Sequence, residues 1–495
     1  MLIMRPISAI AGLLILIMLS RVLSSTDYGN FFAFWAIVEI LILASNLGLI
    51  HAVYRYVSAT EQTDGVILTT GPIWHLVWWR FCTLAFTGFV FMLIPDSIAS
   101  LSKVSIFSGQ ILLCLIAIVF FEGIARFFES IFDSMLCQGR SQISLVSRTF
   151  FRLIGYLIFL SLGSMDLQHV LYADVIATAL GALIAVLMLW DVSRKSRLSG
   201  RQTQKENISF SRMTRFAMPA FAAQVLTLVY GPDALKLILS NTSGTAELAL
   251  FGFAYSLAAV VQRYIPANLL AGVFRPIFVA ASKKHNAEKV LSELLSISIK
   301  LNWMVILPIF CFLFFGGTPL LEMLSGGNYS DAGNVIAIIM LGLLAIAMHL
   351  TFAMYCLARE TSLPILYATI AGTLGLPLGV MLGENYGAIG VAAAFGVSEL
   401  IWSITCFAFL RYYANNALTL DWLGLSKLLC GTLFVVVLCS LLKSFWSNWW
   451  PAYTILAPLL FIIVIYLSRV FSEQEQTWLK SILPSSKLLK FGNLK

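Results

Sequence analysis

Charged residues are scarce in this chain: Asp, Glu, Lys and Arg make up only 11% of its 495 residues, and 59% of the chain is hydrophobic. A typical soluble domain carries about 25% charged residues. This shortage of charge excludes an ordinary soluble protein and indicates a polytopic membrane protein. We assign the formal net charge of +8 to loops and tails, so it does not indicate nucleic-acid binding.

The chain also lacks the cysteine and histidine patterns that are typical of metal sites. Seven of its eight cysteines fall in or at the ends of apolar segments, and no C-x-x-C occurs. The eighth, Cys137, lies in a polar stretch, and His75 and His349 have no metal-ligand spacing. We therefore expect no disulfide framework, no metal and no cofactor.

Apolar runs of roughly 17–25 residues, the length that crosses a bilayer as a helix, recur along the whole chain. They predict an all-α fold with about fourteen transmembrane helices. The predicted spans cover residues 6–23, 28–53, 72–94, 105–128, 149–163, 170–190, 216–239, 248–274, 294–315, 335–357, 364–382, 388–410, 425–442 and 451–467.

The longest polar interruption, residues 191–215, orients these spans. Its basic residues outnumber its two acidic ones, Asp191 and Glu206. They are Arg194, Lys195, Arg197, Arg201, Lys205, Arg212 and Arg215. Basic loops beside apolar spans stay on the cytoplasmic side, and an even number of spans then leaves both termini in the cytoplasm.

A weak internal repeat relates the parts of the chain on either side of this linker, at an offset of about 220 residues. Val53-Tyr54-Arg55 matches Val273-Phe274-Arg275, and Arg80 matches Lys300. Six spans per repeat would give the two halves one orientation. We expect a bundle at 1–190, the cytoplasmic linker at 191–215, a second bundle at 216–411, and two additional helices with a tail at 412–495.

Charges within predicted spans are candidate functional residues, because each costs about 3 kcal/mol at the centre of a bilayer. Arg263 lies near the middle of its span, beyond snorkelling reach. Asp233 and Lys236 follow Gly231-Pro232, which must interrupt a helix and indicates a cavity wall.

Other charges within spans have simpler explanations or weaker functional support. Arg126, Arg152 and Lys300 lie close enough to the cytoplasmic ends of their spans to snorkel. Glu122 and Arg126 are four residues apart and can neutralise each other. Glu39 and Glu399 are central acids, which we consider as sites for a coupling ion.

Several stretches resemble the polysaccharide flippase branch of the multidrug/oligosaccharidyl-lipid/polysaccharide exporter superfamily. Residues 19–23 (LSRVL), followed by Tyr28-Gly29, are similar to that family's R-x-L-x(4)-Y-G opening. Residues 233–239 (DALKLIL) and 251–255 (FGFAY) resemble the start of its second half, and residues 386–394 (YGAIGVAAA) resemble its twelfth span.

The resemblance implies two pseudo-symmetric six-helix bundles around a central cavity, plus two extra C-terminal helices. It also implies a non-enzymatic flippase that moves an undecaprenyl-diphosphate-linked glycan across the inner membrane by alternating access. Arg263 would hold the diphosphate midway. The expected cavity residues also include Arg80, Lys236, Asp233, Arg55, Arg275 and Lys300, and Glu39, Asp233 or Glu399 would couple transport to protons or sodium.

Two alternatives remain open from the sequence. A cation-coupled multidrug exporter of the same superfamily would typically have twelve spans, so the extra pair argues against it. A membrane polymerase or ligase would need a large outer loop, whereas residues 316–334 hold only Glu322 and Asp331 as acids. The expected partners are a lipid-linked glycan, membrane lipid and glycan polymerase or export machinery.

Overall fold

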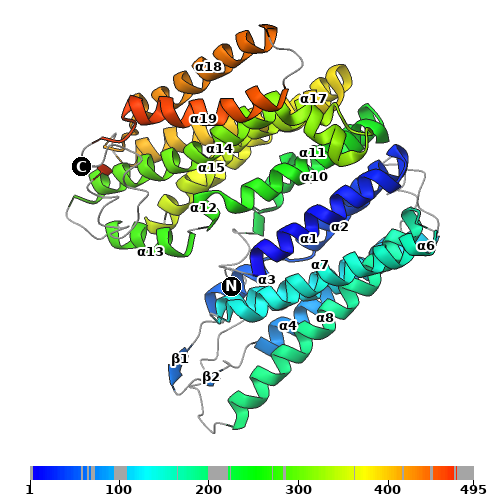
Figure 1. Cartoon of the computed structure of the whole chain (residues 1–495). Coiled ribbons are helices and arrows are strands. Elements are labelled where there is room, and N and C mark those ends of the chain that lie inside the picture. Colours follow the sequence, from blue (N-terminus) through cyan, green and yellow to red (C-terminus); the bar gives the residue numbers. More distant parts are fainter. Residues whose placement is uncertain are drawn as a thin grey trace. The chain divides into compact units, whose positions relative to one another are not determined.

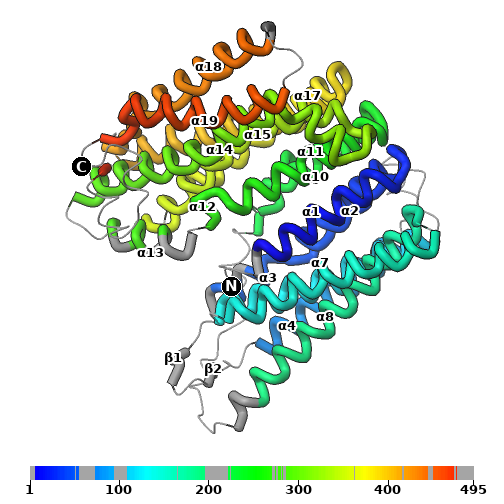
Figure 2. Tube along the Cα trace, viewed as in Figure 1, coloured from blue at the N-terminus to red at the C-terminus, as the bar shows by residue number. Residues whose placement is uncertain are grey.

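The computed structural model describes residues 4–56, 60–63, 66–68, 73–93, 109–135, 137–163, 165–198, 221–222, 224–269, 271–282, 286–359, 361, 363–414, 417–445, 450–472 and 475–476. The described chain is α-helical apart from a small antiparallel sheet of β1 (Thr60–Thr63) and β2 (Val66–Leu68). It forms two compact units, Met1–Ala249 and Leu250–Lys495 (Figure 1). Figure 2 traces both along the chain, from the blue N-terminus to the red C-terminus.

Unit 1 is built from helices that pack around an apolar core. They are α1 (Met4–Val22), α2 (Ser25–Ala44), α3 (Leu49–Tyr56), α4 (Ile73–Leu93), α6 (Gly109–Ser134), α7 (Gln138–Ser161), α8 (Leu167–Leu198) and α10 (Pro232–Thr242). Helix α8 packs against α6 and α7, and α10 packs against α2. Fully buried Val38, Leu115 and Leu171 join α2, α6 and α8 in the core.

Unit 2 is centred on two long helices that pack along each other, α14 and α15. Helix α11 (Thr245–Tyr264) enters it, followed by α12 (Pro266–Leu269), α13 (Ala271–Ser282), α14 (Ala287–Ser325), α15 (Ala332–Ala358), α16 (Leu363–Gly372), α17 (Gly375–Tyr413), α18 (Trp422–Phe445) and α19 (Trp450–Ser468). Helix α17 packs against α15 and α16, and α18 and α19 both pack against α14.

The predicted polytopic all-α fold is confirmed. Among the described residues, 11 helices are long and apolar enough to cross a membrane, and Pro6–Val22 is a shorter apolar helix. One of the eleven, Leu363–Tyr413, contains two predicted spans on either side of a backbone break at Gly387 (φ 55°, ψ −135°). Helical residues 224–230 and α10 match the span predicted at 216–239. Together with Pro6–Val22 and the division of Leu363–Tyr413 at Gly387, this match raises the number of spans from 11 to about fourteen.

Two predicted spans are broken in ways that position polar groups. The span expected at 28–53 divides between α2 and α3, where Leu47 (φ 45°) and Gly48 (φ 79°) adopt the left-handed conformation. The span expected at 248–274 ends as α11 at Tyr264, because Pro266 lacks a backbone donor and clashes with the preceding turn. Arg263 therefore lies in the last turn of α11, and not within an uninterrupted helix.

The Tyr28-Gly29 motif has a packing role within unit 1. Tyr28 is buried, and its hydroxyl donates to the carbonyl oxygen of Leu16 at 3.3 Å. A Cβ at Gly29 would collide with the backbone of Thr245, so glycine permits this close approach.

The four-part division at 1–190, 191–215, 216–411 and 412–495 stays a prediction. Most of the basic linker lies outside the described residues.

Candidate functional site

Seven charged side chains from four helices of unit 1 form one connected network, here called the ionic cluster. Its members are Glu39 on α2, Glu122, Arg126 and Glu129 on α6, Arg148 and Arg152 on α7, and Asp174 on α8.

Arg126 and Glu39 form the more exposed end of the ionic cluster. The two terminal nitrogens of Arg126 donate to the two carboxylate oxygens of Glu39, each at 2.6 Å. Arg126 Nε also donates to Glu122 Oε1 at 2.8 Å. The Arg126 and Glu39 side chains remain 34% and 33% exposed, more than any other member of the ionic cluster.

Glu122 is the buried centre of the ionic cluster. Its carboxylate lies 2.7 Å from Arg148 Nη1 and 3.1 Å from Arg152 Nη2, in addition to its contact with Arg126. Arg148 also donates to Glu129 at 2.5 Å. Three guanidinium groups therefore surround one buried carboxylate, which offsets the cost of placing its charge in an apolar unit.

Asp174 closes the other end of the ionic cluster and is fully buried. It accepts hydrogen bonds from Trp35 Nε1 at 3.1 Å and from the Tyr156 hydroxyl. Arg152 Nε lies 3.4 Å from Asp174, and the guanidinium sits 4.5 Å from the centroid of the Trp35 ring. Asp174 is thus held by its own unit and is not available to a ligand.

Helical spacing explains part of this arrangement. Glu122, Arg126 and Glu129 follow one another at intervals of four and three residues, which places them on one face of α6. Arg148 and Arg152 share a face of α7 in the same way. Spacing in the sequence predicts Glu122–Arg126 as a self-neutralising pair, but it does not predict a role for Arg148, which precedes the predicted span at 149–163.

The second ionic feature of unit 1 is the pair between Asp233 and Lys236 in the first turns of α10. Lys236 Nζ donates to Asp233 Oδ1 at 2.8 Å. Pro232 begins α10 at its first position, where a missing N–H costs nothing. Because α10 packs on α2, Lys236 also interacts electrostatically with Glu39. The structure thereby joins three of the predicted site residues.

Arg80 lies on α4 and is 98% buried, at 2% exposure. Its guanidinium donates to the carbonyl oxygen of Ile42 at 3.0 Å and to Ser45 Oγ at 3.2 Å. Among the described residues no carboxylate forms an ion pair with it. Arg80 thus caps the C-terminus of α2, where a cation interacts favourably with the helix dipole.

Lys300 lies on α14 and has a fully buried side chain. Its ammonium is 2.6 Å from Glu475 Oε2, donates to the Val470 carbonyl oxygen at 3.1 Å and also contacts Asp421. The structure places Arg55 in α3 and Arg275 in α13, but their side chains lie outside the described residues.

Arg263 is exposed, and the chain break that follows it is stabilised by two asparagines. Buried Asn302 on α14 accepts a hydrogen bond from the Ala267 backbone N–H at 2.7 Å. Asn268 Nδ2 donates to the carbonyl oxygen of Gln262 at 2.8 Å. These bonds satisfy backbone groups freed by the break, as interrupted membrane helices require.

Glu399 on α17 pairs with His349 on α15. The distance from His349 Nδ1 to Glu399 Oε2 is 2.9 Å. The imidazole stacks on Trp402, with 3.5 Å between ring centroids and 13° between planes, and Trp402 Nε1 donates to Thr369 at 3.2 Å. This positions one titratable histidine against a carboxylate in unit 2.

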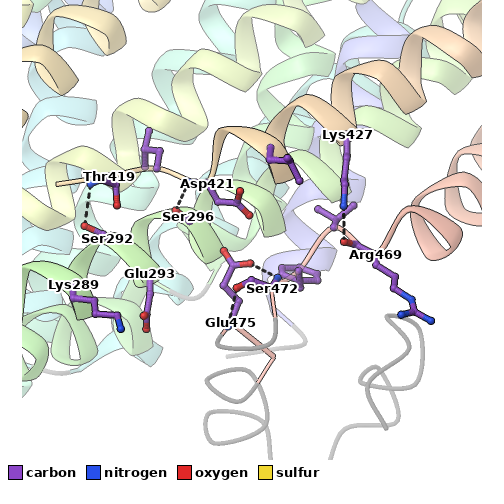
Figure 3. A pocket seen from close by; sticks show the side chains of 14 residues that line it. Lys289, Ser292, Glu293, Ser296, Thr419, Asp421, Lys427, Arg469, Ser472 and Glu475 are labelled. Atoms are coloured by element: carbon purple, nitrogen blue, oxygen red, sulfur yellow. Dashed lines mark hydrogen bonds between the residues drawn. The ribbon is translucent and has the colours of Figure 1, made fainter. Parts of the chain in front are cut away.

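Unit 2 also contains a polar pocket of about 370 Å³ at the first turns of α14 (Figure 3). Its walls come from α14, from residues 419–427 and from residues 469–475. Hydrogen bonds from Thr419 to Ser292 and from Asp421 to Ser296 hold the chain before α18 against α14. Positive and negative side chains line the pocket together, so it has no single-sign field.

No group of three or more metal-ligating side chains occurs among the described residues. The helices and the embedded ionic groups define a polytopic membrane protein, and its fold is that of solved membrane transporters. The chain is similar to the lipid II flippase MurJ in an inward closed conformation, with 14% identity, a TM-score of 0.69, and coverage of 95% of this chain and 99% of that chain.

The chain is also similar to a multidrug resistance MATE family transporter of the MOP superfamily in an inward-facing conformation. That match has 13% identity and a TM-score of 0.62, and covers 83% of this chain and 95% of that chain. A Vibrio cholerae MATE transporter, VcmN, matches with 14% identity and a TM-score of 0.58, covering 83% and 96%. A search of curated proteins finds no match.

A family model described as polysaccharide biosynthesis protein matches residues 1–282, more than half of the chain. The chain belongs to this polysaccharide biosynthesis protein family.

Proposed function

We propose that the protein flips an undecaprenyl-diphosphate-linked oligosaccharide or polysaccharide precursor across the cytoplasmic membrane by alternating access. The observation that carries the proposal is the exposed guanidinium of Arg263, in the last turn of α11 next to a helix break. Membership in a polysaccharide biosynthesis family and a fold like that of a lipid II flippase support it.

The physical argument concerns the cost of charge at membrane depth. An arginine that faces lipid at the centre of a bilayer costs about 3 kcal/mol or more. Arg263 avoids that cost because it lies in the last turn of a 20-residue helix that is long enough to cross a bilayer by itself, so its exposed guanidinium can face water or an anion at the end of the span. Irregular backbone beside a span is tolerated where it lines a water-filled cavity, so the break after Arg263 favours the mouth of a cavity, and a diphosphate is the anion that a lipid-linked glycan carries.

The structure supports the other predicted cavity residues to different degrees as substrate-binding groups. Lys236 is mostly buried, paired with Asp233 and close to Glu39, so it contributes positive charge beside the exposed end of the ionic cluster. Arg80 and Lys300 already have partners inside their own units, which a substrate would have to replace. Arg55 and Arg275 are proposed as cations at the cytoplasmic mouth from the sequence repeat alone.

Glu39 and Glu399 are proposed sites for a coupling ion. Glu399 is the better supported of the two, because it pairs with the imidazole of His349 at 2.9 Å, whereas both carboxylate oxygens of Glu39 are held by Arg126. We place the protein in the inner membrane with both termini cytoplasmic. Translocation needs no bond to be made or broken, so we propose a transporter that works beside glycan polymerase or export machinery and not an enzyme.

Deletion of the gene in its host tests the proposal. We expect loss of the surface glycan, accumulation of its lipid-linked precursor in the inner leaflet, and unchanged susceptibility to drugs. Normal glycan export with increased drug susceptibility would instead support a cation-coupled multidrug exporter. Accumulation of unpolymerised glycan in the outer leaflet would support a polymerase or ligase.

A further inference from the structure

The Arg126–Glu39 pair has the geometry of an anion-binding site that is already filled by a carboxylate of the same chain. Both terminal nitrogens of Arg126 bond to Glu39, at 2.6 Å each. Phosphate oxygens present the same spacing to a guanidinium fork and bind it in the same bidentate way. A diphosphate can therefore replace Glu39 at Arg126 without a change in the orientation of the arginine.

Exposure distinguishes this pair from the rest of the ionic cluster. The Arg126 and Glu39 side chains are about one-third exposed, whereas those of Glu122 and Arg148 are only 4% and 5% exposed. This end of the cluster is its most exposed part, since Arg152 is 21% exposed and the other members less. The buried members act as support that positions Arg126.

Replacement of Glu39 would leave no buried charge unpaired. Glu122 would keep Arg148 and Arg152, at 2.7 and 3.1 Å. Arg126 would keep its Nε bond to Glu122 at 2.8 Å. Glu39 would retain the favourable charge of Lys236 on the neighbouring helix α10. Breaking most buried ion pairs is strongly destabilising because one charge is stranded, and this pair avoids that cost.

Resting on the flippase function proposed above, we infer that Glu39 is an internal competitor for Arg126, which the diphosphate of the substrate displaces. Without substrate, Glu39 neutralises Arg126 and keeps a bare guanidinium out of the apolar unit. With substrate, the diphosphate takes the two terminal nitrogens. On release, Glu39 returns to Arg126, so the site exchanges one anion for another and never holds an uncompensated cation.

Binding measurements on the purified full-length protein in phosphatidylcholine nanodiscs test this exchange. The probe is undecaprenyl diphosphate, and undecaprenol, which lacks the diphosphate, is the comparison ligand. We expect Glu39→Gln to bind the diphosphate about tenfold more tightly than wild type, because the competitor is removed. Arg126→Gln should lose at least about tenfold, and Arg126→Lys should lose less, because charge without the fork survives.

The double variant and a matched control sharpen the test. Glu39→Gln with Arg126→Gln should bind like Arg126→Gln alone, since a competitor has no effect once its site is gone. Asp166→Asn removes a carboxylate of unit 1 that lies outside the ionic cluster and bonds to His169, and should leave the affinity unchanged. The melting temperatures of all variants are recorded to confirm that they fold. If Glu39→Gln does not fold, Glu39→Asp, whose side chain is shorter, replaces it.

Reconstituted transport supplies a second readout. Glu39→Gln should bind more tightly yet flip more slowly, since release of the diphosphate is no longer assisted. Weaker or unchanged binding by folded Glu39→Gln (or by Glu39→Asp, should that be the variant that folds) would overturn the exchange. Wild-type protein that binds undecaprenyl diphosphate no better than undecaprenol would instead overturn the proposed substrate class itself.

Discussion

The ammonium of Lys300 lies 2.6 Å from a carboxylate oxygen of Glu475, a residue 175 positions later in the chain. Asp421 contacts the same ammonium. Asp421 precedes α18 and Glu475 follows α19, so one buried lysine on α14 holds both ends of the additional helix pair. This contact explains why a lysine at this position is compatible with complete burial.

Lys300→Met should therefore destabilise the protein and not only impair transport. Removal of one partner from a buried ion pair typically costs about 3–5 kcal/mol, because the remaining charges are stranded. We expect a clearly lower melting temperature in detergent and a partial recovery when Glu475→Gln is added. Lys427→Met, which removes a partly exposed lysine bonded to the carbonyl oxygen of Arg469, is the control. Normal stability with lost transport would favour the substrate-binding role predicted for Lys300.

The same contact predicts a response to acid. Partial burial tends to raise the pKa of Asp421, but hydrogen bonds from Lys300 and the Gly424 backbone N–H outweigh it, so the pKa lies below its ordinary value. A lowered carboxyl pKa contributes stability above the unfolded value of about 4, and that stability is lost as pH falls towards the folded value. Asp421→Asn should reduce the loss of melting temperature below about pH 4, and Asp331→Asn should not.

Arg263→Ala should abolish glycan export while protein abundance in the membrane stays unchanged. An exposed arginine contributes little to packing, so its loss should affect the substrate more than the fold. Arg263→Lys should retain part of the activity, because charge remains without bidentate geometry. Arg411→Ala, at an exposed arginine in the last turn of α17, is the matched control. Reduced abundance would indicate that Arg263 stabilises the helix break, and full export would remove it from the mechanism.

His349→Gln should reduce the dependence of flipping on pH, because it removes the imidazole that pairs with Glu399. Glu399→Gln should reduce it as well, because the pair then loses its carboxylate. His169→Gln, at a histidine bonded to Asp166 in unit 1, should leave the profile as in wild type. The measurement is flipping in proteoliposomes with the same pH on both sides. An unchanged profile in His349→Gln would exclude this pair from ion coupling.

Cysteine labelling in a cysteine-free background tests the fourteen-span topology. Ser102→Cys and Asn328→Cys should react with an impermeant reagent from outside. Ser199→Cys and Ser485→Cys should react only after the membrane is opened. Basic loops retained in the cytoplasm are the physical reason for this pattern. Labelling of position 328 only from the cytoplasm would show that the orientation is wrong from the linker onward.

Hydropathy predicted the spans well because a bilayer leaves little choice: every backbone polar group at that depth must be satisfied within a helix. The breaks were harder to predict. The sequence predicts an interruption at Pro232, whereas it predicts one continuous span through Pro266. The two breaks differ because the second one depends on Asn302 and Asn268. These side chains form hydrogen bonds with backbone groups around the break and are distant from one another in the sequence.

The membrane class, the approximate number of spans and the charged residues within them could all be predicted from the sequence, since these follow from local composition. The role of each charge depends on packing and could not be predicted in the same way. Arg80 and Lys300 match in the repeat, yet one caps α2 and the other joins Asp421 and Glu475. Arg126 has its near neighbour Glu122 one turn away, but its accessible partner is Glu39 on another helix. Inside an apolar protein, a charged side chain pairs with the opposite charge that the packing of the helices brings close to it. Local spacing in the sequence does not specify that partner.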